Sequence, residues 1–405
     1  MKNSPVSRIW NKMYTCAFIA NFMLCVSQFI VNPLVATYAG VLGADSVMIG
    51  VISGLYFGVA FAVRPFSGPA ITKLNKKYIM LAAYALGCVV NVIYALSNGI
   101  PLFVTARILH GVQFAFIGSL NMTLASDSLP PEKLGSGLGL FGVGGAVATA
   151  IAPSLGISLR AWGETLFAST TAGYTIVFSV AAACMLISII PCLIMPYKPL
   201  TGAELQSLGK WYKNIIATEA ILPAVVVTFY SIAGIMYTIF MEPFAREQGI
   251  GNIGLFFTVY AIAILAARPL CGRLVDKYGT AKIFFPSSVL FAASFLITGT
   301  SRMLGQVLVG AALAAIGYGS AQPALQTMCM RSVAAPRRGV ASNTNYFGMD
   351  FGYFIGPTIG GFVIARTSHA SLFTLTIIPV FIAVAIFAIG LKPFNERVMK
   401  KRLGD

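Results

Sequence analysis

The feature that most limits the fold of this chain is a short sequence signature that occurs twice, half a chain apart. The first copy begins at Arg64-Pro65 and the second at Arg268-Pro269, which sets an offset of 204 residues. The offset holds without a gap for four further pairs: Gly135 and Gly339, Gly144 and Gly348, Pro153 and Pro357, Gly156 and Gly360. A chain of 405 residues that repeats itself at this distance consists of two copies of one unit.

The composition indicates that this unit lies in a membrane. Hydrophobic residues make up 57% of the chain and charged residues only 10%. A soluble domain is about a quarter charged, so lipid must cover much of this surface. Apolar stretches long enough to cross about 30 Å of hydrocarbon recur along the chain. We predict spans over residues 13–40, 47–67, 78–97, 101–126, 135–158, 166–196, 215–243, 253–272, 281–300, 303–328, 339–365 and 370–391.

The repeat divides these twelve spans into two sets of six. We therefore predict an all-α membrane protein of two pseudo-symmetric six-helix bundles, residues 1–197 and 214–405. A cytoplasmic linker, residues 198–213, joins them and contains Pro199, Gly202 and Gly209.

Several kinds of chemistry lack their usual sequence signals. There is no GxxxxGK[ST] loop for ATP, no CxxC pair among the seven cysteines, and only two histidines, His110 and His369. The run Gly137-x-Gly139-x-x-Gly142 fits a dinucleotide pattern, but no strand precedes it and it lies in a predicted span. We therefore expect no enzyme activity, no cofactor and no metal.

Basic residues outside the spans predict the orientation. They gather in alternate loops, on the side of both termini, whereas the opposite loops hold only Arg160, Arg246, Arg302 and Arg366. By the positive-inside rule both termini are cytoplasmic, in a cell or inner membrane. The net charge of +16 then reflects topology and attraction to anionic lipid, and we expect no nucleic-acid binding. The clusters are Lys2/Arg8/Lys12, Lys73/Lys76/Lys77, Lys198/Lys210/Lys213, Arg273/Lys277/Lys282, Arg331/Arg337/Arg338 and Lys392 through Arg402.

The repeated signature resembles the cytoplasmic loop motif of the major facilitator superfamily, Gly-x-x-x-Asp-Arg/Lys-x-Gly-x-Lys/Arg. The second copy matches at Gly272, Asp276, Lys277 and Gly279. The first copy has Gly68 and Lys73, but it departs from the motif at Thr72, in place of the acid, and at Asn75, in place of the second glycine. In the family this acid contacts a helix end and holds the cytoplasmic side closed, so the resemblance implies such a contact for Asp276 and does not extend it to Thr72.

Two more matches cover other parts of the chain. Arg107-x-x-x-Gly111 looks like the family's arginine motif. Two sets of residues resemble the family's Gly-Pro motif. The weaker match is Gly144, Pro153 and Gly156, and the stronger match is Gly348, Gly352, Gly356, Pro357 and Gly360. We expect these glycines, and the row Gly50, Gly54 and Gly58, to let helices approach closely. The whole pattern resembles bacterial proton-coupled drug and metabolite exporters.

Few ionisable residues lie deep in the predicted spans, where each of them is expensive. Asp350 lies roughly 15 Å from the start of its span. An apolar site favours the protonated carboxyl group, so Asp350 is a candidate proton carrier; the alternative is a structural acid that pairs with a neighbouring helix. Arg107 and His110 share one helix face and are candidates for coupling or gating, and the alternative for both is helix packing.

Polar and aromatic residues predict a substrate cavity. Asn21, Gln28 and Asn32 form one stripe on the first span. The resemblance implies that the first, fourth, seventh and tenth helices line the cavity, which adds Asn121, Tyr230, Tyr237, Tyr318 and Gln322. Such walls suit amphipathic molecules. The alternative is polar contacts between helices.

The resulting hypothesis is a monomeric secondary transporter that exports small amphipathic compounds in exchange for protons, by alternating access. Uptake of a sugar or organic anion, movement of a lipid-linked sugar between leaflets, and a non-transporting membrane sensor are the alternatives.

Overall fold

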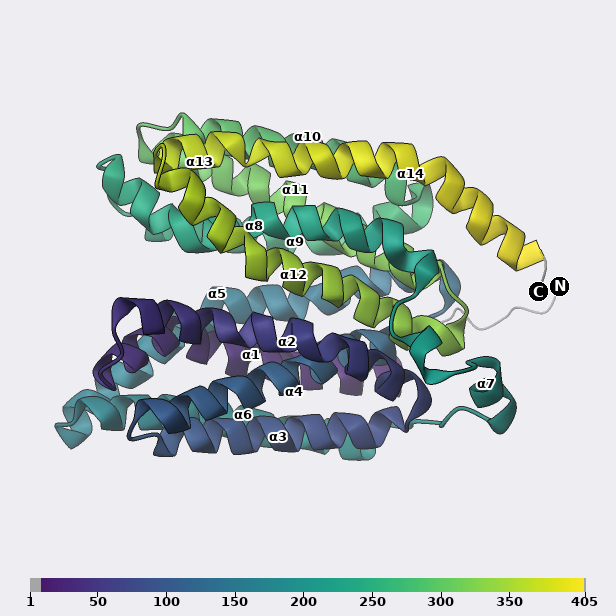
Figure 1. Cartoon of the computed structure of the whole chain (residues 1–405), viewed down its shortest axis with the longest axis horizontal. Helices are drawn as coiled ribbons and strands as arrows, with labels where there is room; N and C mark the ends of the chain where they lie inside the picture. The colour runs from purple at the N-terminus through teal and green to yellow at the C-terminus, as the bar shows by residue number, and fades with distance from the viewer. Residues whose placement is uncertain (1–8, 404–405) are drawn as a thin grey trace. The chain divides into compact units, whose positions relative to one another are not determined.

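A computed structural model describes residues 9–403, and over this range the chain forms helices and no strand (Figure 1). Lys2 and Arg8, of the predicted amino-terminal basic cluster, lie outside the described residues. Within residues 9–403, twelve helical segments are long and apolar enough to cross a membrane. The prediction of an all-α chain with twelve spans is confirmed.

The helices follow the predicted order. The first six spans are α1 (Lys12–Val41), α2 (Ser46–Lys73), α3 (Lys76–Leu96), α4 (Ile100–Asp127), α5 (Leu134–Phe167) and α6 (Thr170–Ile194). The short α7 (Gly202–Ser207) lies in the linker. The last six spans are α8 (Ile221–Glu247), α9 (Gly254–Tyr278), α10 (Thr280–Gly299), α11 (Leu304–Arg331), α12 (Arg338–Ile364), and α13 (His369–Leu375) together with α14 (Ile377–Leu403).

Several helices are longer than predicted, because hydropathy marks the hydrocarbon-facing stretch whereas the helix continues into polar sequence. The prediction ended the fifth span at residue 158, but α5 runs to Phe167. Arg160 pairs with Glu164 one turn later at 3.6 Å and donates to the Tyr174 hydroxyl at 3.1 Å, which stabilises this extension. Arg160 and Arg246, predicted in loops, lie inside α5 and α8.

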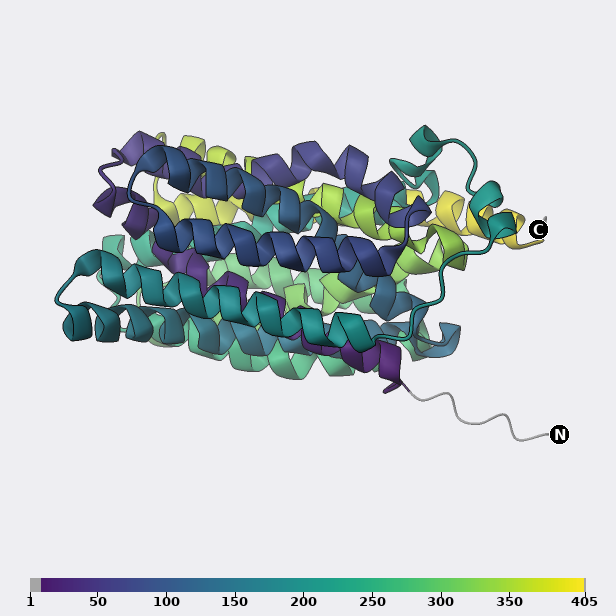
Figure 2. The same ribbon diagram turned by 90° about the horizontal axis from the view of Figure 1, so that it is seen from below.

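Contacts divide the chain into two compact units. Unit 1 comprises residues 1–130 and 144–215, and unit 2 comprises residues 131–143 and 216–405. The start of α5 thus belongs to unit 2 and the rest of this helix to unit 1. In each unit the helices lie side by side along their lengths (Figure 2).

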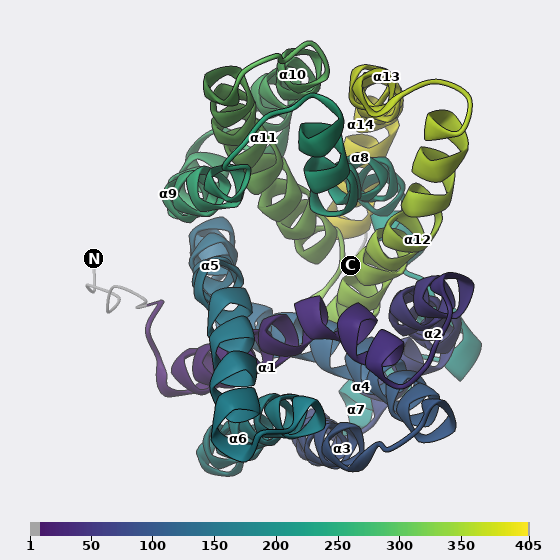
Figure 3. The same cartoon turned by 90° about the vertical axis from the view of Figure 1, so that its left-hand side faces the viewer.

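The internal repeat is visible in the packing within each unit. In unit 1, α4 packs on α2 and α3, and α1 packs on α6; in unit 2, α11 packs on α9 and α10, and α8 packs on α14 (Figure 3). Unit 2 has an aromatic core, in which Tyr237 stacks on Phe256 and Phe295. The repeated sequence therefore produces the same helix neighbours twice.

The two copies of the loop signature turn in different ways. In the second copy, Gly279 ends α9 with φ of 84°, a conformation that favours glycine. At the corresponding position of the first copy, Asn75 has φ of −66° and its side chain accepts hydrogen bonds from the first backbone N–H groups of α3. Asn75 is thus a helix N-cap, and its conformation requires no glycine.

The linker is ordered by local bonds. The Thr201 N–H and hydroxyl donate to the Glu204 carboxylate at 2.7 and 2.8 Å, forming a capping box at the start of α7. These bonds hold the pKa of Glu204 below its usual value. Lys73, at the end of α2, donates to the Gly209 carbonyl and so ties the linker to α2.

Candidate functional site

In unit 1, Arg107 and His110 form a buried group between α2, α3 and α4. Arg107 donates to the carbonyls of Ile52 and Ser53, both at 3.1 Å, and its guanidinium lies 4.9 Å from the ring centre of Tyr56. His110 Nδ1 lies 3.4 Å from the Tyr94 hydroxyl. Carbonyl dipoles and an aromatic face thus stabilise the Arg107 charge inside the bundle, and the group joins α4 to α2 and α3.

The predicted amides of unit 1 fall into two sets. Asn121 is fully buried and donates to Asn21 at 3.2 Å and to the Tyr84 hydroxyl at 3.0 Å, so these groups satisfy one another. Gln28 is half-buried and Asn32 is exposed, and among the described residues neither has a hydrogen bond. An amide of a membrane span that is exposed and unbonded requires water or a polar solute beside it. Gln28 and Asn32 are therefore the amides of the stripe that have no hydrogen bond within the described residues.

In unit 2, two of the predicted cavity tyrosines bond inside the bundle. The Tyr230 hydroxyl is bonded to Ser288, and Tyr237 donates to Ser294 at 2.9 Å. Both rings are buried, and both serines lie on α10. These hydroxyls therefore join α8 to α10, which is the arrangement expected of polar contacts between helices.

Asp350 lies in the middle of α12 with 1% of its surface exposed. Tyr353, one turn later, lies within electrostatic range of Asp350, and its hydroxyl oxygen is 2.7 Å from that of Tyr318. Gln322, one turn after Tyr318 on α11, donates to the sulfur of Met349 at 3.6 Å. The structure thus brings a buried acid and two phenols together in unit 2. Tyr353 was absent from the predicted site, although its spacing of three residues from Asp350 is a signal that could have identified it.

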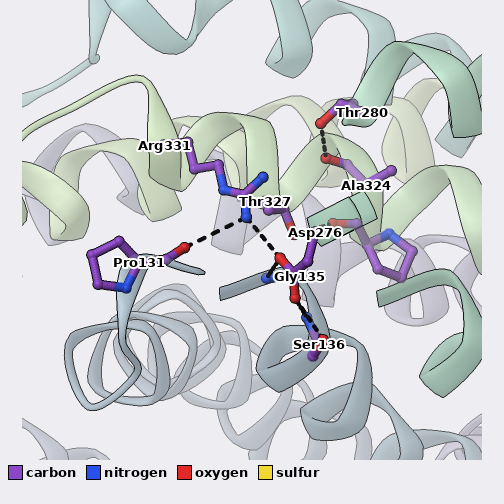
Figure 4. Close-up of polar contacts among 9 residues, drawn as sticks. Pro131, Gly135, Ser136, Asp276, Thr280, Ala324, Thr327 and Arg331 are labelled. Atoms are coloured by element: carbon purple, nitrogen blue, oxygen red, sulfur yellow. Dashed lines mark hydrogen bonds and ion pairs between the residues drawn. The ribbon is translucent and has the colours of Figure 1, made fainter. Parts of the chain in front are cut away.

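In the second copy of the loop signature, polar contacts are centred on Asp276 (Figure 4). Its carboxylate accepts from the backbone N–H groups of Gly135 and Ser136 at 2.8 and 2.6 Å and from the Ser136 hydroxyl at 2.5 Å. Arg331 pairs with the same carboxylate at 2.7 Å. An acid at this position satisfies the free N–H groups at the start of α5 and the positive end of its dipole.

The first copy makes different contacts, all within unit 1. Thr72, in place of the acid, donates to the Gly68 carbonyl of its own helix at 2.8 Å. Lys76 pairs with Asp127 at 2.6 Å, and the Lys76 side chain is 3% exposed. In this half the motif therefore fastens α3 to the end of α4. In the second copy, Lys277 is exposed beside the Tyr278 ring.

Glycines allow the close approach of two helix pairs in unit 2. A Cβ on Gly139 would lie 2.6 Å from the Arg268 carbonyl oxygen, and one on Gly272 would lie 2.5 Å from the Gly135 carbonyl oxygen. These contacts join α5 to α9. In the second pair, α12 meets α8 along the row Gly348, Gly352, Gly356 and Gly360. Pro153 and Pro357 lie inside α5 and α12.

The first glycine row differs from the prediction. A Cβ on Gly50 or on Gly54 would meet no heavy atom within 4 Å. The prediction of close helix approach is wrong at these two positions, because spacing alone does not tell which face of α2 another helix covers. Among the described residues, no three His, Cys, Asp or Glu side chains come together as a metal site requires.

Comparison with known proteins agrees with this architecture. A sequence model of the Major Facilitator Superfamily matches residues 17–244 and 221–402. The chain is 26% identical over 398 residues to multidrug resistance protein MdtG of Enterobacter lignolyticus, covering 92% of this chain and 90% of that protein. It is 28% identical over 391 residues to MdtG of Klebsiella pneumoniae, covering 92% of both chains.

Two solved structures share the fold. The human organic anion transporter MFSD10 (TETRAN) superposes with a TM-score of 0.76 at 15% identity, over 95% of this chain and all of that chain. The transporter FucP in its outward conformation gives a TM-score of 0.74 at 14% identity, over 93% of this chain and 98% of that chain. At these identities the likeness shows the fold alone.

Proposed function

Because the chain belongs to the major facilitator superfamily, we propose that it is a secondary active transporter that exports small amphipathic compounds in exchange for protons. The names of its relatives, multidrug resistance proteins that match over about nine-tenths of the chain, support efflux. The chain is a multi-pass membrane protein and not an enzyme. We propose that it works as a monomer, with both termini in the cytoplasm.

The observation that carries proton coupling is the carboxyl group of Asp350. It is buried at mid-helix, where ionisation is costly, and it lies in electrostatic range of Tyr353. The protonated carboxyl group is neutral, whereas the deprotonated carboxylate carries a charge that needs polar partners. The two protonation states therefore favour different surroundings. A group of this kind can link proton binding to a change of conformation.

Free polar groups support a substrate contact in unit 1. Gln28 and Asn32 present amides that no described residue bonds, and each amide can both donate to and accept from a solute. Arg107, whose charge the α2 carbonyls stabilise, supports the neighbouring packing in this proposal. We propose that Asp276 and the start of α5 form contacts that break and re-form during transport, because hydrogen bonds to the end of a helix can be exchanged without unwinding it.

The function is tested by flux into proteoliposomes under an imposed pH gradient, with an amphipathic cation, an amphipathic anion and an amphipathic neutral compound. We expect gradient-driven movement of at least one compound, abolished by a protonophore. Asp350→Asn should reduce driven flux to the level of protein-free vesicles while binding remains, because the amide keeps the shape and cannot carry the proton.

The matched control is Asp45→Asn. Asp45 is exposed at the N-cap of α2, where it accepts from the Met48 N–H at 2.8 Å, and asparagine caps equally well. Unchanged driven flux in Asp350→Asn would refute proton coupling at Asp350. Binding of the whole panel without any flux would favour a sensor over a transporter.

A further inference from the structure

Two arginines related by the internal repeat have different surroundings. Arg64 is fully buried and donates to the Ala115 carbonyl at 2.8 Å and to the Ser119 hydroxyl at 3.2 Å. Its guanidinium also lies 5.6 Å from the Phe114 ring centre. These contacts join α2 to α4, so Arg64 is a packing residue of unit 1.

Arg268 has fewer contacts than Arg64. It lies ten or more residues from either end of α9, and it is half-buried. One terminal nitrogen donates to the Gly142 carbonyl, and the buried Nε has no hydrogen-bond partner among the described residues. A permanent charge at this depth requires compensation, and one carbonyl supplies little of it. Packing therefore explains Arg64 but leaves most of the hydrogen-bonding capacity of Arg268 unused.

Three phenols of unit 2 lie within electrostatic range of this guanidinium. Tyr260 lies two turns before Arg268 on α9, and Tyr318 and Tyr353 come from α11 and α12. Tyr318 and Tyr353 are held by their mutual hydroxyl contact of 2.7 Å, and the Phe291 ring packs 5.5 Å from that of Tyr318. One cation and three hydroxyl groups from three helices thus lie in the same part of unit 2, and the bond between Tyr318 and Tyr353 uses one of the three O–H donors.

We propose that Arg268, Tyr260, Tyr318 and Tyr353, which we name the Arg268 cluster, bind the oxyanion head of an amphipathic substrate. A planar guanidinium matches a carboxylate, sulfonate or phosphonate with two parallel hydrogen bonds. Phenol hydroxyls add donors without adding charge. The inference rests on the transport function proposed above and narrows its substrates to organic anions.

The bond to Gly142 gives the cluster a link to α5. A Cβ on Gly142 would lie 3.0 Å from the bonded nitrogen of Arg268, so the glycine makes room for the guanidinium. An oxyanion that engages Arg268 competes for the donor that now holds the Gly142 carbonyl. Substrate binding would then loosen α5 from α9 at this point, within unit 2.

The test measures binding of octane-1-sulfonate to the full-length protein in lipid nanodiscs, because this probe stays ionised at every pH used. Octyltrimethylammonium and octanol are the cationic and neutral counterparts with the same chain. We expect the sulfonate to bind and the other two to bind at least about tenfold more weakly, since only the sulfonate satisfies the guanidinium.

Three variants examine the cluster. Arg268→Gln should weaken sulfonate binding by roughly thirtyfold or more, and Arg268→Lys by about tenfold, because an ammonium keeps the charge but loses the fork. Tyr353→Phe should weaken it by about threefold to tenfold through loss of one hydroxyl. Arg273→Gln, an exposed arginine of the same helix, is the matched control and should bind normally. Thermal unfolding of each variant checks that it is folded.

The proposal would be overturned if folded Arg268→Gln bound the sulfonate as tightly as the unsubstituted protein does. It would also be overturned if the unsubstituted protein bound the ammonium probe more tightly than the sulfonate. The same titration at pH 5.5 and 7.5 distinguishes failure of the anion-site proposal from failure of the proposed proton antiport. Tighter sulfonate binding at low pH would mean that proton and anion bind together, which contradicts antiport but keeps the anion site. Weaker binding at low pH would support the anion site and antiport but not Asp350 as the coupling acid, because protonating Asp350, which lies in electrostatic range of Tyr353, removes a negative charge that opposes anion binding.

Discussion

At the scale of single residues, position in the repeat does not decide what a side chain does. Asp276 receives two backbone N–H groups, a hydroxyl and a guanidinium, whereas Thr72 at the corresponding position bonds only to its own helix. Arg64 and Arg268 also differ, since Arg64 bonds to α4 and Arg268 bonds to α5. The chain has thus placed its ionic helix cap in the second copy and a local hydroxyl contact in the first.

A stability measurement tests the contribution of the Asp276 carboxylate. Asp276→Asn keeps the shape and removes the charge that both N–H groups and Arg331 contact, so we expect a loss of about 1–3 kcal/mol in the free energy of unfolding. Thermal unfolding in nanodiscs measures it. Thr72→Val removes the hydroxyl at the repeat-related position and should change stability by less than about 1 kcal/mol. Equal shifts in the two variants would contradict a special role for this cap.

At the scale of helices, the start of α5 packs against α9 through backbone rather than through side chains. Gly135 and Gly139 of α5 face Gly272 and the Arg268 carbonyl of α9, at distances that no side chain would permit. Close backbone contact of this kind gains van der Waals energy in a membrane, where apolar side chains gain little by leaving lipid. Helix packing therefore explains Gly139 and Gly142, two of the three glycines that fit a nucleotide motif by letters alone.

Replacing one of these glycines should separate the two helices. Gly139→Ala puts a Cβ 2.6 Å from the Arg268 carbonyl oxygen, and we expect a loss of about 1–3 kcal/mol in unfolding free energy, measured by thermal unfolding. Gly54→Ala is the control, because its Cβ meets no heavy atom within 4 Å. That variant should be neutral or stabilised by up to about 1 kcal/mol, since alanine favours helix. A stable Gly139→Ala protein would show that α5 and α9 need no such contact.

At the scale of the whole molecule, charge in the loops predicts which end of each span faces the cytoplasm. Basic residues gather in the loops on the side of both termini. Lysine and arginine are retained on the cytoplasmic side during insertion, so the carboxy-terminus should be inaccessible from outside the cell. A carboxy-terminal tag should resist protease added to intact spheroplasts and should be cut in inside-out vesicles.

The matched control for orientation is the same tag inserted after Asn98, in the turn between α3 and α4. This turn lies one span from the basic loop at Lys73, Lys76 and Lys77, so the tag should be cut in intact spheroplasts. The reverse result for the two tags would overturn the predicted orientation.

The sequence by itself determined the two-copy plan and the number and order of the spans. These follow from local properties: an apolar stretch of about 20 residues crosses the hydrocarbon whatever its neighbours are. Helix ends were less predictable, because the extension of α5 past residue 158 depends on Arg160, Glu164 and Tyr174 beyond the hydrocarbon. The repeat also identified both loop signatures and the departure at Thr72.

Only the tertiary structure decided which polar groups are satisfied inside a bundle and which remain free. Helical spacing places a residue on a face but does not tell which helix covers that face. The spacing that suggested a cavity for Tyr230 and Tyr237 therefore left open their bonds to α10, and the stripe on α1 divided into a bonded Asn21 and a free Gln28. Arg268 is the sharpest case: the same signature yields a fully buried arginine bonded to α4 in one unit, and in the other a half-buried arginine with one carbonyl bond, within electrostatic range of three phenols. Hydrogen-bond satisfaction is a property of neighbours that are distant in sequence, so it is fixed only when the helices pack.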